Sequence, residues 1–380
     1  MAQKARTWIF VFIAIVLFLP LTQKAFQYIH SAPLNGEYKV APDLDFSWQQ
    51  WFDGSYWAGK DKYINDNMGL RPDLIRLNNQ VDFSLFGKIH SEWRLVGDNS
   101  CIFQDVYIRS YLGKDFSGYP YILEKVRKMK AIQDTLQKLG KSLIFVQSPC
   151  KAFFYPEYFP AEFKDSVKGI SNFETYKRVA DSMGVNQVDL NTWFVSMKKS
   201  STELLYPKQG FHWSVYGAYL GADSVIKYIE HLRGIHMLHP VCTGIEHTTK
   251  ARFKDDDITK TMNLIYPFVT ETFSYPQLKY EGNNAAVKPN VIYVGDSFLF
   301  QWLENGVMDN TDSRWQIWYY NETLINKDIR EEDKHLLGNY DEIGEIGKAD
   351  CIIIMFTSRN LDNLGRNFIE NTYNHYYPAK

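Results

Sequence analysis

The stretch NVIYVGDSFLF carries a serine in a setting that suits a nucleophile. The apolar run from Val291 predicts a buried strand that ends at Gly295, and Ser297 stands two residues beyond that end. In an open parallel sheet, reactive groups collect at the carboxyl ends of the strands. The N–H groups of a helix starting after Ser297 would stabilise an anion there. The tripeptide alone fits equally well a simpler role, in which Asp296 or Ser297 caps the next helix.

A second stretch, YPKQGFHWSVYGAYLGADSV, supplies a candidate base. His212 precedes Trp213 and Ser214, and Ser214 is a suitable N-cap for the helix that follows. This order predicts that His212 lies in a loop at a helix start. An unperturbed imidazole has a pKa of about 6.5, so it can take a proton from a serine hydroxyl at neutral pH. The two stretches together predict acyl transfer with Ser297 as nucleophile and His212 as base.

These motifs also occur in a recognisable order. GDSF, HWSVYGA, INDNMGLR and SPCKAFFYPEYFP, behind an apolar N-terminus, resemble the alginate O-acetyltransferase AlgJ/AlgX-type family, also called the DHHW family, over roughly residues 60–370. The resemblance implies an SGNH hydrolase-like domain in permuted order, with the histidine before the serine. It also implies O-acetylation of an exported polysaccharide in the periplasm, through an acetyl-serine intermediate. The acetyl donor would be supplied by a membrane-bound O-acyltransferase.

One position departs from the pattern of that family. The family places an aspartate two residues before the histidine, where it orients the ring, and this chain has Gly210 there. Loss of the acid in a serine protease triad costs ~10⁴ in rate. Another acid could replace it, the pair could work as a dyad, or the site could be inactive. Asp189, at the end of a predicted strand, is one possible substitute. Asp296 is included among the candidate catalytic residues, although its place beside the nucleophile favours a role in holding the turn.

The elements that must position these residues alternate along the chain. Helical apolar spacing predicts helices over residues 121–140, 172–184 and 214–229, and short apolar runs predict strands over 142–149, 185–191, 291–295, 314–320 and 351–357. Such alternation predicts an α/β fold with a three-layer parallel sheet. We expect a signal anchor over 1–24, a lead-in over 25–90 and the SGNH-like domain over 91–380. A polar stretch over 240–285 reads as an insertion, and its run Asp255-Asp256-Asp257 is expected to be a solvated charge run.

The N-terminus predicts export. Lys4 and Arg6 precede fourteen uncharged residues from Trp8 to Leu21, which is typical of an export signal. The run alone would cover roughly 21 Å, less than the ~30 Å hydrocarbon core unless its flanks join the helix. We expect an uncleaved anchor with the body on the periplasmic face of the inner membrane, or release into the periplasm if the signal is cleaved.

Composition excludes other classes of function. The formal charge of −2 and the lack of a basic cluster give no case for nucleic-acid binding. The four cysteines and nine histidines show no metal-ligand spacing, so we expect no metal and no cofactor. An aromatic content of 16% suits a carbohydrate-handling protein. Three functions remain open: an O-acetyltransferase on an exported polysaccharide, an acetyl esterase of the same fold, and a non-catalytic glycan-binding or assembly subunit.

Overall fold

The chain forms two compact units. The computed structural model describes residues 2–36, 40–90, 93–266, 271–330, 333 and 335–378. Unit 1 comprises Met1–Glu92 and Ile258–Phe268, and unit 2 comprises Trp93–Asp257 and Val269–Lys380. Both units are therefore built from two separate segments of the chain.

Unit 1 is helical. Its elements in the first segment are α1 (Ala2–Phe26), α2 (Trp48–Asp53), α3 (Ser55–Asp66) and α4 (Arg71–Phe86). The second segment is tied to the first by side-chain amides, because Asn263 Oδ1 accepts a bond from the Asn35 N–H at 2.8 Å and Asn79 Nδ2 donates to the Met262 carbonyl at 2.9 Å. Among the described residues, Lys4–Phe26 is long and apolar enough to cross a membrane. The flanks of the apolar run thus do join the helix, as the anchor hypothesis requires.

Unit 2 is organised around a six-stranded sheet. Its strands lie in the order β4-β3-β10-β7-β8-β9. All neighbours are parallel except β9, which pairs antiparallel with β8 at the edge. The strands are β3 (Ser142–Gln147), β4 (Gln187–Asp189), β7 (Asn290–Gly295), β8 (Arg314–Tyr319), β9 (Thr323–Asn326) and β10 (Cys351–Phe356). Every residue of β3 and β10 is buried, as expected for strands with both faces covered.

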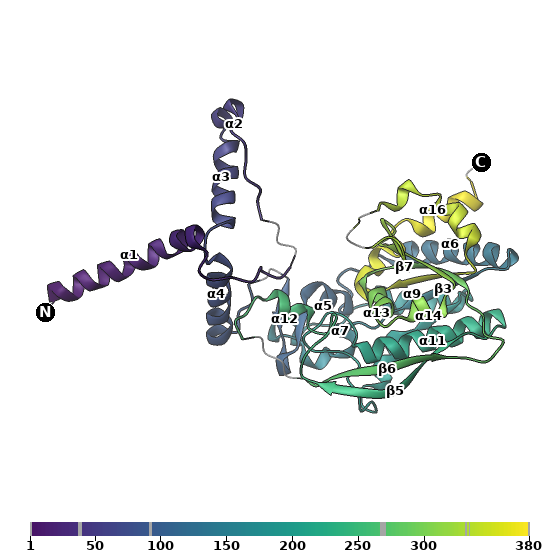
Figure 1. Cartoon of the computed structure of the whole chain (residues 1–380). Helices are drawn as coiled ribbons and strands as arrows, with labels where there is room; N and C mark the ends of the chain where they lie inside the picture. Colours follow the sequence, from purple (N-terminus) through teal and green to yellow (C-terminus); the bar gives the residue numbers. More distant parts are fainter. Residues whose placement is uncertain are drawn as a thin grey trace. The chain divides into compact units, whose positions relative to one another are not determined.

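Helices form the two outer layers. Figure 1 shows α6 and α16 on one side of the sheet and α11 on the other. The apolar periodicity predicted for α6 is confirmed up to Leu136, because Ile122, Val126, Met129, Ile132 and Leu136 are buried. Its last predicted member, Leu139, follows the helix end and is exposed. The longer helices of unit 2 are α6 (Tyr119–Lys138), α9 (Asn172–Ser182), α10 (Leu190–Met197), α11 (Val215–Arg233) and α16 (Phe368–Tyr376). The shorter ones are α5 (Asp105–Tyr111), α7 (Lys151–Phe154), α8 (Ala161–Lys164), α13 (Phe300–Glu304), α14 (Val307–Thr311) and α15 (Glu342–Lys348).

Two small antiparallel pairs complete the described structure. One joins β1 (Arg94–Val96) to β2 (Ile102–Gln104), and the other joins β5 (His239–Thr248) to β6 (Phe273–Glu281). The sequence suggests an insertion over residues 240–285, but this stretch is divided between the two units. Strands β5 and β6 belong to unit 2, and Ile258–Phe268 belongs to unit 1. Helix α12 (Asp257–Thr261) begins at the border between the units.

The predicted fold class is confirmed: unit 2 is a three-layer α/β domain with a mostly parallel sheet. The edge strand β9 is the one departure from an all-parallel sheet. The four cysteines are all free thiols, three of them buried: Cys101, Cys150 and Cys351.

Candidate active site

Ser297 is presented at the carboxyl end of β7, in the middle of the sheet. The strand stops at Gly295, and Ser297 opens a single 3₁₀ turn, Ser297–Leu299. A Cβ atom at position 295 would lie 2.3 Å from the Met355 carbonyl oxygen and 2.7 Å from Leu299 Cδ1. Only glycine fits between β10 and the new turn, so the turn that carries the half-buried Ser297 can begin directly after the strand.

His212 reaches Ser297 from the loop before α11. Ser214 caps that helix as predicted, because its hydroxyl accepts a bond from the Gly217 N–H at 2.9 Å. The imidazole packs against the ring of Phe298, with the ring centres 4.8 Å apart. Gln301 Nε2 donates to the Trp213 carbonyl, which ties the histidine loop to α13. The residues on either side of His212 and Ser297 thus hold the two loops together.

Three side chains form a hydrogen-bonded chain. His212 Nε2 lies 2.8 Å from Ser297 Oγ, and His212 Nδ1 lies 2.7 Å from Asp257 Oδ2. The other oxygen, Asp257 Oδ1, accepts a bond from the Phe211 N–H at 2.8 Å. The expected contact between Ser297 and His212 is therefore present. Asp257 occupies the place of the acid in a serine triad, where it fixes the imidazole tautomer and stabilises the imidazolium.

The acid expected at position 210 has no room there. A Cβ atom on Gly210 would lie 2.6 Å from the Asp255 carbonyl oxygen and 2.9 Å from that of Lys254. The segment that delivers Asp257 thus fills the space in which an aspartate at position 210 would begin. Asp189, proposed from the sequence as a substitute, is not used: it caps α10 through the Thr192 N–H and pairs with Lys177. That hypothesis was wrong.

The prediction of a solvated charge run over residues 255–257 was also wrong. Asp255 is fully buried, and burial raises the pKa of its carboxyl to about 8. The Asp257 side chain is 21% exposed and contacts His212. The sequence predicts that these three aspartates face solvent, because acidic residues are rarely buried. Here the run is folded against the histidine loop.

Asp296 holds the loop after β10. Its Oδ2 atom accepts bonds from the Thr357 N–H at 2.8 Å, the Thr357 hydroxyl at 3.0 Å and Asn360 Nδ2 at 2.8 Å. Burial raises the pKa of this carboxyl, while these bonds act in the opposite direction. Asp296 contacts neither His212 nor Ser297 Oγ in any of these bonds, which agrees with a role in holding the turn.

The N–H groups after Ser297 are already engaged. Asp296 Oδ1 accepts from the Phe298 N–H at 3.2 Å, and its backbone oxygen accepts from the Leu299 N–H at 3.2 Å. The expectation that a helix start at this point offers free donors to an anion was therefore wrong for these two groups.

Further residues that the sequence did not single out surround the triad. The Tyr206 hydroxyl donates to the Phe211 carbonyl, so both backbone groups of Phe211 are held. The Arg94 guanidinium lies 5.8 Å from the centre of the Phe211 ring, and attraction to Asp257 partly offsets the lowering of its pKa by burial. Asp257 itself lies 45 residues from His212, and its only sequence signal was the acidic run.

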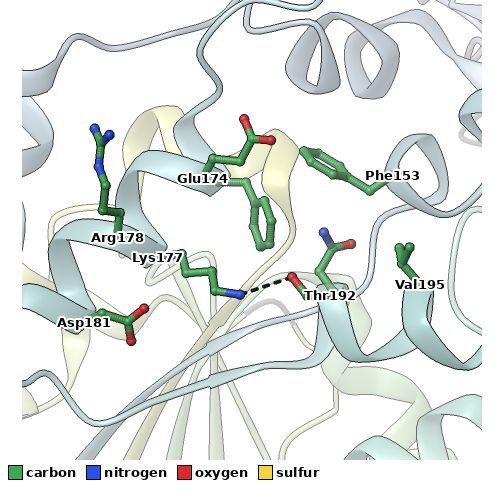
Figure 2. A pocket seen from close by; sticks show the side chains of 9 residues that line it. Phe153, Glu174, Lys177, Arg178, Asp181, Thr192 and Val195 are labelled. Atoms are coloured by element: carbon green, nitrogen blue, oxygen red, sulfur yellow. Dashed lines mark hydrogen bonds between the residues drawn. The ribbon is translucent and has the colours of Figure 1, made fainter.

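A separate pocket of about 420 Å³ lies between α9 and α10 (Figure 2). Lys177 donates to Thr192 Oγ1 at 3.3 Å across it. Its lining residues are Phe153, Phe173, Glu174, Lys177, Arg178, Asp181, Asn191, Thr192 and Val195. None of the triad residues is among them, so this hollow is distinct from the candidate active site.

The sheet carries Ser297 at the end of a central strand, and His212 and Asp257 lie beside it. This arrangement defines an SGNH hydrolase-like α/β domain. Residues 113–265 match the family model described as the SGNH hydrolase-like domain of the acetyltransferase AlgX. This match confirms the resemblance to the AlgJ/AlgX-type family over that segment. The matched segment contains His212 and Asp257 and ends before Ser297.

Solved structures are also similar to this chain. The O-acetyltransferase domain of Pseudomonas putida AlgJ is 17% identical, with 74% of this chain and 99% of that chain covered and a TM-score of 0.47. Pseudomonas aeruginosa AlgX is 13% identical, with 76% and 71% covered and a TM-score of 0.44. Bacillus cereus PatB1 with a sulfonyl adduct is 12% identical, with 66% and 93% covered and a TM-score of 0.42. No curated protein sequence is significantly similar.

Proposed function

We propose that this protein transfers acetyl groups to hydroxyls of an exported polysaccharide through an acetyl-Ser297 intermediate. The observation that supports it most is the unbroken chain from Ser297 Oγ through His212 to Asp257. A serine in hydrogen-bond contact with a base, which is itself oriented by an acid, is the arrangement for nucleophilic acyl transfer.

The first half of the reaction loads the serine. His212 Nε2 takes the proton of Ser297 Oγ as Oγ attacks the carbonyl carbon of an acetyl donor. Asp257 stabilises the imidazolium that forms. The tetrahedral intermediate then collapses, the leaving group takes the proton from His212, and Ser297 is left as an acetyl ester.

The second half unloads the serine. A hydroxyl of the glycan loses its proton to His212 and attacks the acetyl carbonyl, and the proton returns to Ser297 Oγ as the ester bond breaks. Water in place of the glycan would make the protein an esterase with the same residues. The alternative of a non-catalytic binding subunit rested on the missing acid at Gly210, and the presence of Asp257 removes that reason.

The cellular setting belongs to the same proposal. We place the body of the protein on the periplasmic face of the inner membrane, held by α1, with a signal anchor over residues 1–24. We also propose that a membrane-bound O-acyltransferase supplies the acetyl donor and that the catalytic domain spans residues 91–380. These assignments rest on the family resemblance and on the apolar helix.

The test is acetyl transfer from a chromogenic acetyl ester, with and without deacetylated alginate as acceptor. Wild type should become acetylated at Ser297, by mass spectrometry, and should transfer the group to the glycan. Ser297→Ala and His212→Ala should lose activity to similar extents, because members of one catalytic unit are not additive. Ser196→Ala, on the exposed surface of α10, is the matched control and should behave as wild type. Equal activity of wild type and Ser297→Ala would refute the mechanism, and release of acetate without transfer would favour an esterase.

A further inference from the structure

Unit 1 carries a largely exposed group of aromatic rings. We define the aromatic cluster as the six aromatic side chains between residues 46 and 57: Phe46, Trp48, Trp51, Phe52, Tyr56 and Trp57. Their rings contact one another at centre distances from 4.3 Å (Trp51 and Trp57) to 6.1 Å (Trp48 and Phe52). Even so, Trp48 is 67% exposed and Phe52 is 81% exposed. Exposed apolar patches of this kind mark interaction sites.

The same unit contains the helix that could cross a membrane. The eighteen residues from Lys4 to Leu21 rise about 27 Å in a helix, close to the ~30 Å of the hydrocarbon core. Tyr28, which is half exposed, folds back beside the end of α1, because its hydroxyl donates to the Leu19 carbonyl at 3.2 Å. Tyrosine favours the boundary between lipid and water, so the outer boundary falls near Leu21 and Tyr28.

The aromatic cluster lies within reach of that boundary. A Cβ atom on Gly69 would lie 2.2 Å from the Pro20 carbonyl oxygen and 2.8 Å from the Lys24 nitrogen, so the end of α1 packs on the turn between α3 and α4. Helix α3, with 12 residues, is about 18 Å long and carries α2 at its other end (Figure 1). With α3 lying along the bilayer surface, the aromatic cluster meets the headgroup layer about 18 Å from the exit of α1.

The residues around the aromatic cluster favour the lipid boundary over an anionic partner. The neighbouring charges are mostly acidic, with Asp43 and Asp53 exposed and Lys60 paired to Asp43. A surface of this charge has no electrostatic attraction to anionic lipid or to an acidic glycan. Tryptophan and tyrosine rings, with an apolar body and a polar N–H or O–H, suit the headgroup layer of a zwitterionic membrane.

We propose that the aromatic cluster is a second membrane contact, which inserts into the headgroup layer of the bilayer that α1 crosses. This proposal rests on the proposed anchor role of α1. Its consequence is that α3 lies along the membrane surface, so that unit 1 is fixed at two points and cannot swing freely about α1.

The test uses the full-length chain in vesicles of phosphatidylcholine. An environment-sensitive fluorophore is attached at Phe52→Cys, with Cys242→Ser to remove the half-buried native thiol. Val167→Cys, 84% exposed in unit 2, carries the label in the matched control. Emission from position 52 should shift to the blue, and it should be quenched more by a nitroxide near the headgroup than by one at the end of the acyl chain. Adding Trp48→Gln, Trp51→Gln and Trp57→Gln should abolish the shift and the quenching.

The outcomes separate the two proposals. Release of the protein from vesicles by high salt or alkali would show that α1 is not an anchor. Retention without quenching at position 52 would overturn the membrane contact while leaving the anchor intact, and would point to a protein or glycan partner for the aromatic cluster. Equal quenching at positions 52 and 167 would also overturn it, because the contact would then not be specific to the cluster.

Discussion

Replacing Asp257 with asparagine isolates the electrostatic role of the newly found acid. Asp257 Oδ1 accepts from the Phe211 N–H and Oδ2 faces His212 Nδ1. An asparagine can keep its carbonyl oxygen toward Phe211, since an N–H needs an acceptor. Its NH₂ group then faces Nδ1, which must accept, and the ring proton moves to Nε2. That nitrogen then points an N–H at Ser297 and can no longer act as the base.

The expected loss follows from that change of tautomer. In serine proteases, the equivalent substitution leaves the geometry intact and lowers kcat by ~10⁴. A loss of this size corresponds to about 5 kcal/mol of transition-state stabilisation. The fold should be retained, because the bond to Phe211 remains and the side chain keeps its shape. Asp257→Ala should lose as much activity and some stability in addition, since it leaves both the Phe211 N–H and the imidazole without their acceptor.

The assay is hydrolysis of a chromogenic acetyl ester, with thermal unfolding measured on the same preparations. Asp256→Asn is the matched control, one residue away in the same acidic run, and should retain wild-type turnover. If Asp257→Asn turns over as fast as Asp256→Asn, the acid assignment fails and His212 works with Ser297 as a dyad.

Substitutions at three further positions test the surroundings of the triad. From the sequence alone, Gly210→Asp would be expected to restore a missing acid. The structure predicts instead that it lowers both activity and stability, the latter by about 1–3 kcal/mol, because its Cβ overlaps the backbone of residues 254–255. Gly210→Ala should have the same effect, and higher turnover in Gly210→Asp would contradict this reasoning. The pKa of the Asp255 carboxyl is about 8 in the folded protein and near its ordinary 3.8 in the unfolded chain. The unfolded state therefore binds fewer protons between these pH values, and the free energy of unfolding should fall as the pH rises from about 4 to about 8. Asp255→Asn should flatten that profile in chemical denaturation, and an unchanged slope would count against a buried neutral acid. Asp296→Asn places an NH₂ group against donors from Thr357 and Asn360, so it should cost about 1–3 kcal/mol in unfolding free energy and reduce turnover, whereas wild-type stability would show that the loop after β10 is held by other contacts.

Local patterns were sufficient for the elements and for two triad members. Apolar runs located β3, β7, β8 and β10 because strands buried on both faces are almost continuously apolar. Ser297 could be recognised because it follows a strand end that Gly295 marks in the sequence. His212 could be recognised because it precedes a helix start that the N-cap Ser214 marks. These signals act over a few residues, so they can be read directly.

Asp257 could not be found in the same way. Its partner is 45 residues away, and the space it occupies depends on how Gly210 lets the 254–257 segment approach. Neither fact leaves a local pattern. The sequence suggests that Gly210 marks the loss of an acid. In the folded chain, the absence of a Cβ atom at Gly210 lets the 254–257 segment approach, and this segment supplies Asp257 as the acid.

The border between the two units has a practical consequence for shortening the protein. Asp257 is the last residue of its segment in unit 2, and the chain enters unit 1 at Ile258. That short segment is bonded to residues far upstream, as Asn263 is to Asn35. A soluble fragment begun at Trp93 would remove the anchor but also Asn35 and Asn79, which bind the loop that follows the triad carboxylate. A fragment begun just after α1 would keep Asn35 and Asn79 in place, and would keep the peptide that leads out of the active site attached to its support.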